Sequence, residues 1–377
     1  MAEFKRDCKS FPGTYVCDIM YSENKEDCSN CLFYEPIKKK ILIIQLGAMG
    51  DVVRSTSIIP AIKEKYGTDI KITWLTSQEC EYFLKSAPGV DEVLTLGNEN
   101  IKVWHTNSIS EVSLRLSQEH FDVLLNLEIA PPATLLANII NAKEKYGYFY
   151  DKDGHPSVYN EDAKLYLQIA QSNIFNKNTK LSYQELIFKA LNLNYKKQDY
   201  AIKLKINEDY LKKFFEKNNL KKDDNIIGIN IGSASRFPSK TWDLDKVKEL
   251  VAKLKPKYKI ILLGGPNELK IENRIKNIHP LTNDFNNSLE EFVSVLSACK
   301  LLITGDSLHL HLAIALKIPT VALFFTTPPW QIEDYDFLVK IVSPMLEDYY
   351  FSDQYHEKLT KSISSEEVLK QCQKLLS

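Results

Sequence analysis

The stretch that most constrains the fold of this chain is residues 41–57, which read ILIIQLGAMGDVVRSTS. An apolar run at 41–44 ends in a turn that contains Gly47 and Gly50, and a segment with helical spacing follows Asp51. A short buried strand that leads through a tight turn into a helix is the opening unit of a nucleotide-binding α/β domain. Such folds place their chemistry at the carboxyl ends of parallel strands, so the carboxylate of Asp51 is expected at that edge.

Length, charge and hydropathy narrow the class of protein. A chain of 377 residues exceeds what one compact core usually requires, so we expect two domains. The formal net charge of −1 does not indicate a nucleic-acid-binding protein. No apolar stretch approaches the ~20 residues that cross a bilayer, and the first residues lack the apolar core of a signal peptide. We therefore expect a cytoplasmic protein, free or peripheral to the cytoplasmic face of the inner membrane.

Strand-like and helix-like segments alternate in two series, which predicts two Rossmann-like halves, each with a parallel sheet covered on both faces. In the first half, strands are predicted at 41–46, 70–75, 92–96 and 122–127, and helices at 55–66, 108–118 and 133–141. In the second half, strands are predicted at 226–231, 259–263, 301–304 and 320–324, and helices at 244–255, 267–276, 289–298 and 308–315.

These patterns divide the chain into four predicted segments. They are a cysteine-containing extension at 1–37, an N-terminal domain at 38–200, a C-terminal domain at 201–344 and a tail at 345–377. The tail ends in a predicted helix that we expect to pack back on the N-terminal domain.

The first candidate site is the turn that carries Asp51. Gly47 and Gly50 would let a ligand approach the backbone, and Asp51 would act as a general base. Alternatively, Asp51 merely caps the helix that follows, a role that aspartate often fills. A helix N-terminus also favours the ionised carboxylate, which makes it a weak base.

The second candidate is the segment NIGSASRFPSKTW, which begins at the end of a predicted strand. Its small residues Gly232 and Ser233 offer backbone N–H groups, and Arg236 and Lys240 offer positive charge. Together these groups suit a diphosphate, whose charge they would neutralise as it leaves. The alternative is an ordinary loop with exposed cations.

The third candidate, GGPNE, also follows a strand directly. Gly265 would let a nucleoside lie against the backbone, and Glu268 would bind the ribose hydroxyls, as acidic residues do in dinucleotide folds. A turn with two glycines has this composition without any ligand, so the plain turn is the alternative.

The fourth candidate is TGDSLHLH, where a predicted strand ends and a helix begins. After Gly305, either Asp306 or Ser307 would cap the helix, and its free N–H groups would point to the ligand. His309 and His311 are two residues apart on the helix and cannot share a face, so this pair alone does not predict a metal site.

Four cysteines form a C-x8-C-x10-C-x2-C series in the extension. In a cytosolic chain such a series favours a structural metal over disulfides, with zinc as the first choice and iron as the alternative. Free thiols in an unstructured leader are the other interpretation. The predicted ligands are Cys8, Cys17, Cys28 and Cys31.

Taken in order, these segments resemble the ADP-heptose:lipopolysaccharide heptosyltransferases, glycosyltransferase family nine. The resemblance runs from about residue 39 to residue 330, through ILIIQLGAMGDVVRSTSIIPAIKEKYGTDIKITWLT, GINIGSASRFPSKTW, LLGGPNE and TGDSLHLHLAIALKIPTVALF. It implies an α/β protein of the GT-B fold, whose two Rossmann-like domains have parallel sheets facing a central cleft. The acceptor would bind the N-terminal domain and the nucleotide sugar mainly the C-terminal one.

The same resemblance implies roles for individual residues. Asp51 matches the general base and Glu268 the position near the ribose. Arg236 and Lys240 lie in the segment that supplies a cation to the phosphates. The family motif D-[ST]-G-x-x-H is matched by Asp306, Ser307 and His311, with Leu308 in place of the motif glycine.

The function that the resemblance implies is an inverting transfer of a heptose or a related sugar from an ADP-sugar, without a catalytic metal. The acceptor would be a glycan or lipid-linked glycan such as lipopolysaccharide core. Two alternatives remain open. One is a catalytically impaired nucleotide-sugar-binding protein, which Leu308 motivates, and the other is a GT-B transferase or epimerase that uses another nucleotide sugar.

Overall fold

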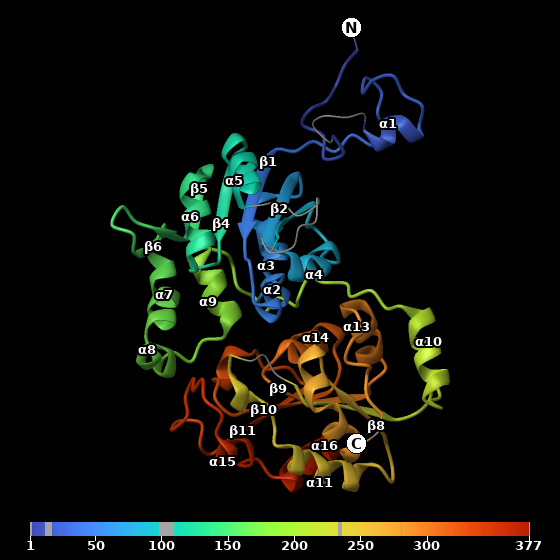
Figure 1. Ribbon diagram of the computed structural model, residues 1–377. Helices are drawn as coiled ribbons and strands as arrows, with labels where there is room; N and C mark the ends of the chain where they lie inside the picture. Colours follow the sequence, from blue (N-terminus) through green and yellow to red (C-terminus); the bar gives the residue numbers. More distant parts are fainter. Residues whose placement is uncertain (1, 12–16, 98–108, 233–235, 280, 377) are drawn as a thin grey trace. The chain divides into compact units, whose positions relative to one another are not determined.

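The computed structural model describes the chain except for residues 1, 12–16, 98–108, 233–235, 280 and 377 (Figure 1). The chain forms two compact units. The first unit consists of Met1–Ala48, Ser55–Ala170 and Gln184–Ala201, and the second of Met49–Arg54, Gln171–Tyr183 and Ile202–Ser377. The predicted domain boundaries at residues 37, 200 and 344 stay predictions.

The first unit is built on a six-stranded sheet with the order β3-β2-β1-β4-β5-β6. Its strands pair in parallel except at the edge, where β6 runs antiparallel to β5. The apolar run that the sequence places in β1 is fully buried at the centre, as the buried-strand pattern predicts. The strands are β1 (Lys39–Ile44), β2 (Ile70–Ser77), β3 (Glu92–Leu96), β4 (His120–Asn126), β5 (Asn141–Tyr150) and β6 (Pro156–Val158).

The helix predicted at 55–66 corresponds to α3, which begins at residue 58, and a separate helix, α2, precedes it. The turn after β1 already starts α2, and Thr56 and Ser57, both fully buried, separate it from α3. Farther on, α5 and α6 bury apolar stripes against the sheet, with Leu116 and Leu136 in one core cluster with Leu42. The helices from the extension to residue 190 are α1 (Asp18–Ser22), α2 (Met49–Ser55), α3 (Ile58–Tyr66), α4 (Glu81–Lys85), α5 (Ile109–Gln118), α6 (Pro131–Ile139), α7 (Lys164–Gln171), α8 (Asn173–Asn178) and α9 (Tyr183–Ala190).

The second unit contains a five-stranded sheet with the order β11-β10-β9-β7-β8, and all its pairs are parallel. Helices α13 and α14 lie on one face and α11 and α16 on the other (Figure 1). This is the doubly wound arrangement that alternation of strands and helices predicts. The strands are β7 (Ile226–Asn230), β8 (Lys259–Leu263), β9 (Leu301–Gly305), β10 (Thr320–Phe324) and β11 (Leu338–Val342).

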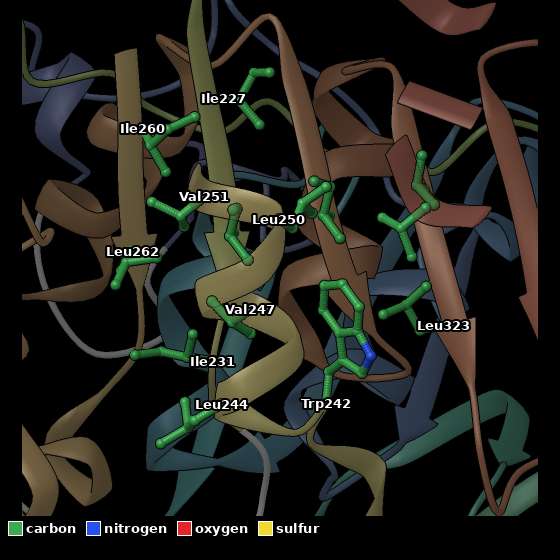
Figure 2. Close-up of a cluster of buried hydrophobic side chains, with 14 of the residues drawn as sticks. Ile227, Ile231, Trp242, Leu244, Val247, Leu250, Val251, Ile260, Leu262 and Leu323 are labelled. Carbon is green, nitrogen blue, oxygen red and sulfur yellow. The ribbon is translucent and has the colours of Figure 1, made fainter. Parts of the chain in front are cut away.

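Helix α11 (Leu244–Leu254) shows how one face of this sheet is covered. Asp243 caps the helix by accepting hydrogen bonds from the N–H groups of Asp245 and Lys246. Its apolar residues recur at helical spacing, and Figure 2 shows Val247 and Leu250 directed at the strands beside Trp242. The other helices of this unit are α10 (Glu208–Lys217), α12 (Glu272–Ile278), α13 (Leu289–Ser297), α14 (Leu308–Leu316), α15 (Glu357–Thr360) and α16 (Ser365–Leu376).

The C-terminal helix belongs to the second unit, where α16 packs on α11. Its expected packing on the N-terminal domain stays a prediction. Val368 and Cys372 are fully buried in the core of that unit, and the Ser365 hydroxyl donates a hydrogen bond to Glu249 at 2.8 Å. The apolar stripe of α16 is therefore used to complete the second core.

The predicted fold class, α/β with a parallel sheet in each half, is confirmed. The helix predicted at 267–276 begins later, because Pro266–Ile271 forms a 3-10 turn before α12. Strands β5, β6 and β11 were not predicted. None of the helices within the described residues is long and apolar enough to span a bilayer.

Candidate functional site

A buried asparagine connects the loops at the carboxyl edge of the second sheet. Asn230 ends β7, and its side-chain Nδ2 lies 2.9 Å from the Thr304 hydroxyl and 3.1 Å from the Ser307 hydroxyl, while its Oδ1 accepts from the Gly232 N–H at 3.0 Å. The loop after β7 is thereby held to the motif after β9. Sequence reasoning did not select Asn230, although its place at a strand end, two residues before a motif glycine, is a signal for such a role.

A cation and a carboxylate meet at this edge. Lys240 Nζ lies 3.0 Å from Asp306 Oδ2, and the Thr327 hydroxyl donates to the same oxygen at 2.7 Å. Burial alone would raise the pKa of Asp306, but the charge of Lys240 and these hydrogen bonds outweigh it and hold the pKa well below its usual range. The predicted phosphate-binding lysine and the predicted motif aspartate are therefore brought together as an ion pair.

His311 lies deep in the same site. It is 4% exposed, and burial lowers its pKa to about 4, with further lowering by Arg54 and Lys240 and opposition from Asp306 and Asp51. A neutral imidazole can accept and donate hydrogen bonds but carries no charge to a phosphate. The motif histidine is thus placed in the site as a neutral group.

The buried imidazole of His311 should make the free energy of unfolding depend on pH in the mildly acidic range. His311 has a folded pKa of about 4 and an ordinary unfolded value of 6.5, so the unfolded chain binds the extra proton between these values. Its contribution to stability is complete above pH 6.5 and is lost as the pH falls toward 4. We expect the free energy of unfolding to drop by about 2 kcal/mol from this group between pH 7 and pH 5. Urea titrations at both values should show a smaller drop for His311→Gln, and an equal drop would contradict this assignment.

Gly50 has a packing reason to be glycine. A Cβ at this position would lie 2.6 Å from Cδ2 of the buried His311 ring. The glycine therefore lets the first turn of α2 approach the motif histidine closely.

Gly50→Ala is expected to lower the free energy of unfolding by about 1–3 kcal/mol and to reduce activity, because the His311 ring must move. Thermal and urea unfolding measure the first effect. Gly265→Ala is the matched control for stability, since its Cβ would meet Glu268 at an ordinary 3.8 Å. If the Gly50→Ala variant were as stable as the unmodified protein, the close approach of residue 50 to the His311 ring would not require glycine.

Asp51 lies in the first turn of α2, and its carboxylate is paired with an arginine. Arg54 donates from Nε at 3.0 Å and from Nη2 at 2.5 Å, both to Oδ1 of Asp51. Within the described part of the chain no backbone N–H donates to this carboxylate, so the helix-cap interpretation gains no support. Gly50, next to Asp51, lies against the His311 ring, and the charges of both ion pairs, Asp51 with Arg54 and Asp306 with Lys240, act on the pKa of His311.

Glu268 is turned toward backbone at the end of β8. Its Oε2 accepts from the Gly265 N–H at 2.7 Å, and a Cβ on Gly232 would meet its carboxyl group at 2.6 Å. Burial raises the pKa of Glu268, and the hydrogen bond to Gly265 opposes that rise. The structure thus brings together three residues that were predicted to bind the nucleotide, Gly232, Gly265 and Glu268.

The remaining predicted residues differ in their placement. Arg236 is exposed, with its guanidinium 5.1 Å from the Phe237 ring centroid. A Cβ on Gly305 would meet the Lys240 carbonyl oxygen at 2.5 Å, so this glycine is required for packing. Gly47 belongs to the first unit, and Ser233 lies outside the described residues.

The cysteines of the extension surround one small cavity but do not form a metal-binding set. Cys8, Cys17, Cys28 and Cys31 all line a cavity of about 10 Å³, and none of them is in a disulfide. In the residues that the structure describes, no three His, Cys, Asp or Glu side chains are grouped so that they could hold a metal ion. Within the described residues, the four thiols are therefore not arranged as the predicted tetrathiolate site.

A known protein family and individual known proteins are both similar to this chain, and both comparisons indicate heptosyltransferases. The family model of glycosyltransferase family 9 (heptosyltransferase) matches residues 110–358. Lipopolysaccharide heptosyltransferase 1 of Campylobacter coli is 25% identical over 304 residues, which cover 78% of this chain and 85% of that protein.

Solved structures share the architecture. A family 9 glycosyl transferase from Veillonella parvula has a TM-score of 0.67 at 20% identity and covers 91% of this chain and 98% of its own. A heptosyltransferase of E. coli, solved with ADP-2-deoxy-2-fluoro heptose, has a TM-score of 0.59 at 17% identity and covers 89% and 99%. At these identities the likeness establishes the fold, GT-B with α/β domains.

Proposed function

The chain belongs to glycosyltransferase family 9, the heptosyltransferases, and on that premise we propose that it transfers a heptose from ADP-heptose to a glycan acceptor with inversion. The relatives are named lipopolysaccharide heptosyltransferases, one of them a lipopolysaccharide core heptosyltransferase, and we take that core as the acceptor. The observation that carries the proposal is the placement of two charged pairs around His311, Asp51 with Arg54 and Asp306 with Lys240. One carboxylate to take a proton and one cation to receive a diphosphate are what such a transfer requires.

The reaction would be a single displacement. An acceptor hydroxyl oxygen forms a bond to the anomeric carbon, the bond from that carbon to the diphosphate oxygen breaks, and the hydroxyl proton passes to Asp51. The leaving ADP carries the bonding electron pair, and Lys240 faces its developing charge with the N–H groups at the start of α14. Because Lys240 is already paired with Asp306, the diphosphate would share or replace that carboxylate as its partner.

No metal is invoked in this step. Arg236 is exposed and makes no ion pair with a described residue, so it remains available as a second cation for the phosphates. Glu268 would hold the ribose. In the domain division predicted above, residues 38–200 would bind the acceptor and residues 201–344 the nucleotide sugar, with the protein acting in the cytoplasm or peripherally at the inner membrane.

The direct test is transfer from ADP-heptose to a lipopolysaccharide core acceptor, followed by mass spectrometry of the product. A thermal-shift series with ADP-, GDP- and UDP-sugars identifies the donor, because a ligand that binds the folded protein raises its melting temperature. Conversion of free nucleotide sugar without an acceptor would instead indicate an epimerase.

Leu308 occupies the motif glycine position and motivates the alternative of an impaired enzyme. If ADP-heptose binds but no transfer occurs, Leu308→Gly separates the two readings. Transfer by that variant would show that the leucine side chain blocks the reaction, and binding without transfer in both proteins would favour a nucleotide-sugar-binding protein.

We further propose a structural zinc ion on the thiolates of the extension, with iron as the alternative. The support is that all four thiols line the same small cavity and are free of disulfides, although they would have to close on it. We expect purified protein to contain zinc by elemental analysis and Cys28→Ser to lose it. Cys299→Ser is the matched control, because burial raises the pKa of Cys299 to about 12 and keeps that thiol protonated. Iron in place of zinc would identify the alternative, and metal-free protein would overturn the proposal.

A further inference from the structure

Among the residues that the structure describes, only one oxygen of the Asp51 carboxylate is engaged. Both guanidinium contacts from Arg54 are to Oδ1, and among the described residues Oδ2 has no hydrogen-bonding partner. The side chain of Asp51 is 34% exposed, so the second oxygen can meet a substrate. A carboxylate held through one oxygen presents the other in a defined direction.

Arg54 is itself fixed by residues far along the chain. Its guanidinium carbon lies 3.5 Å from the centroid of the Tyr183 ring, and Nη1 donates to the Gln331 carbonyl oxygen at 3.4 Å. The side chain is only 12% exposed. A planar guanidinium stacked on an aromatic ring keeps its hydrogen-bonding fork in one plane, which an ammonium group cannot do.

We infer that Arg54 is a positioning residue for the transfer reaction and that Tyr183 is the platform on which it rests. This inference rests on the proposed role of Asp51 as the base. Arg54 holds Oδ1, and Oδ2 faces the acceptor hydroxyl and receives its proton. Neither Arg54 nor Tyr183 touches the reacting atoms.

The pairing also has an electrostatic side. Each of the two carboxylates whose charge acts on the pKa of His311 has its own cation. Asp51 pairs with Arg54, and Asp306 pairs with Lys240. Such pairing prevents the charge of Asp51 from repelling the diphosphate of the donor. Orientation is then the main contribution of Arg54, since misplacement of a reacting group by about 1 Å can cost ~10²-fold in rate.

The test compares kcat and KM for Arg54→Ala and Arg54→Lys. For Arg54→Ala we expect kcat to fall by about 10²-fold with an unchanged KM for ADP-heptose, and added guanidinium chloride to restore part of kcat. The kcat of Arg54→Lys should stay below that of Arg54→Ala with added guanidinium, because the lysine ammonium group lacks the planar hydrogen-bonding fork. The exposed Arg274→Ala is the matched control and should be unaffected in kcat, with and without guanidinium.

The platform is tested at Tyr183. Tyr183→Phe keeps the ring and should retain most of kcat, whereas Tyr183→Leu should lose it in parallel with Arg54→Ala. Circular dichroism and melting temperature confirm that each variant is folded.

The outcomes separate this inference from the proposed function. If Asp51→Asn is fully active, the proposed base is wrong and the inference fails with it. If Asp51→Asn is inactive but Arg54→Ala keeps wild-type kcat, or loses kcat without any guanidinium rescue, Arg54 does not position the carboxylate. In the Asp51→Asn background, Arg54→Ala should cause no further loss, and an additional large loss would also overturn the inference.

Discussion

Asp51→Asn is expected to lower turnover by about 10²–10⁴-fold while ADP-heptose binds nearly as well as before. Asparagine keeps a carbonyl oxygen for Arg54, so the local hydrogen bonds survive, but it cannot accept the proton of the acceptor hydroxyl. Steady-state kinetics give the change in kcat, and calorimetric titration with ADP-heptose gives the affinity.

The control for this substitution is Asp353→Asn, which removes an exposed carboxylate from the same unit. That variant should match the unmodified protein in both measurements. An Asp51→Asn protein with normal turnover would remove the general base from the mechanism, whereas a large loss of donor affinity would mean that Asp51 acts in binding.

Lys240→Met should cause two separable losses. Without the ammonium group, the departing diphosphate loses a preorganised positive charge, and we expect kcat to fall by about 10²–10³-fold. Asp306 is left without its cation, which should lower the free energy of unfolding by about 2–3 kcal/mol. This loss is smaller than the ~3–5 kcal/mol expected when one partner of a fully buried ion pair is removed. The reason is that the Lys240 and Asp306 side chains are still 19% and 18% exposed.

A double variant tells the two losses apart. Lys240→Met with Asp306→Asn removes both charges, so much of the stability should return while the rate does not. Lys246→Met is the control, since Lys246 pairs with Glu249 on the surface of α11. If the double variant recovered activity as well, Lys240 would serve only to neutralise Asp306.

Strands β1 to β4 and β7 to β10 could be predicted because their apolar runs are short, buried and bounded by turns. Strand β5 escaped because its first half, with Glu144 among its residues, is largely exposed and charged, so it has neither an apolar run nor an alternating one. The C-terminal helix α16 has the expected amphipathic pattern, but a periodic pattern does not specify which sheet it covers.

The candidate site shows the same limit. Lys240 and Asp306 were both selected from the sequence, and the structure shows that their side chains meet, while their roles stay predictions. Asn230, Arg54 and Tyr183 were missed, because their importance lies in contacts with residues far away in sequence. Gly50 was assigned to ligand approach, whereas the structure gives it a contact with His311.

The grouping of Met49–Arg54 with the C-terminal half has a consequence for engineering such enzymes. A chimaera joined at one crossover near residue 200 would take the Asp51–Arg54 ion pair from one parent. It would take Gln331, whose carbonyl oxygen accepts from Arg54, and His311 from the other parent. Exchange of the second unit between family members therefore calls for transplanting the short segments 49–54 and 171–183 together with residues 202–377. Recombination libraries that respect this interleaving should yield more active progeny than libraries cut at the midpoint.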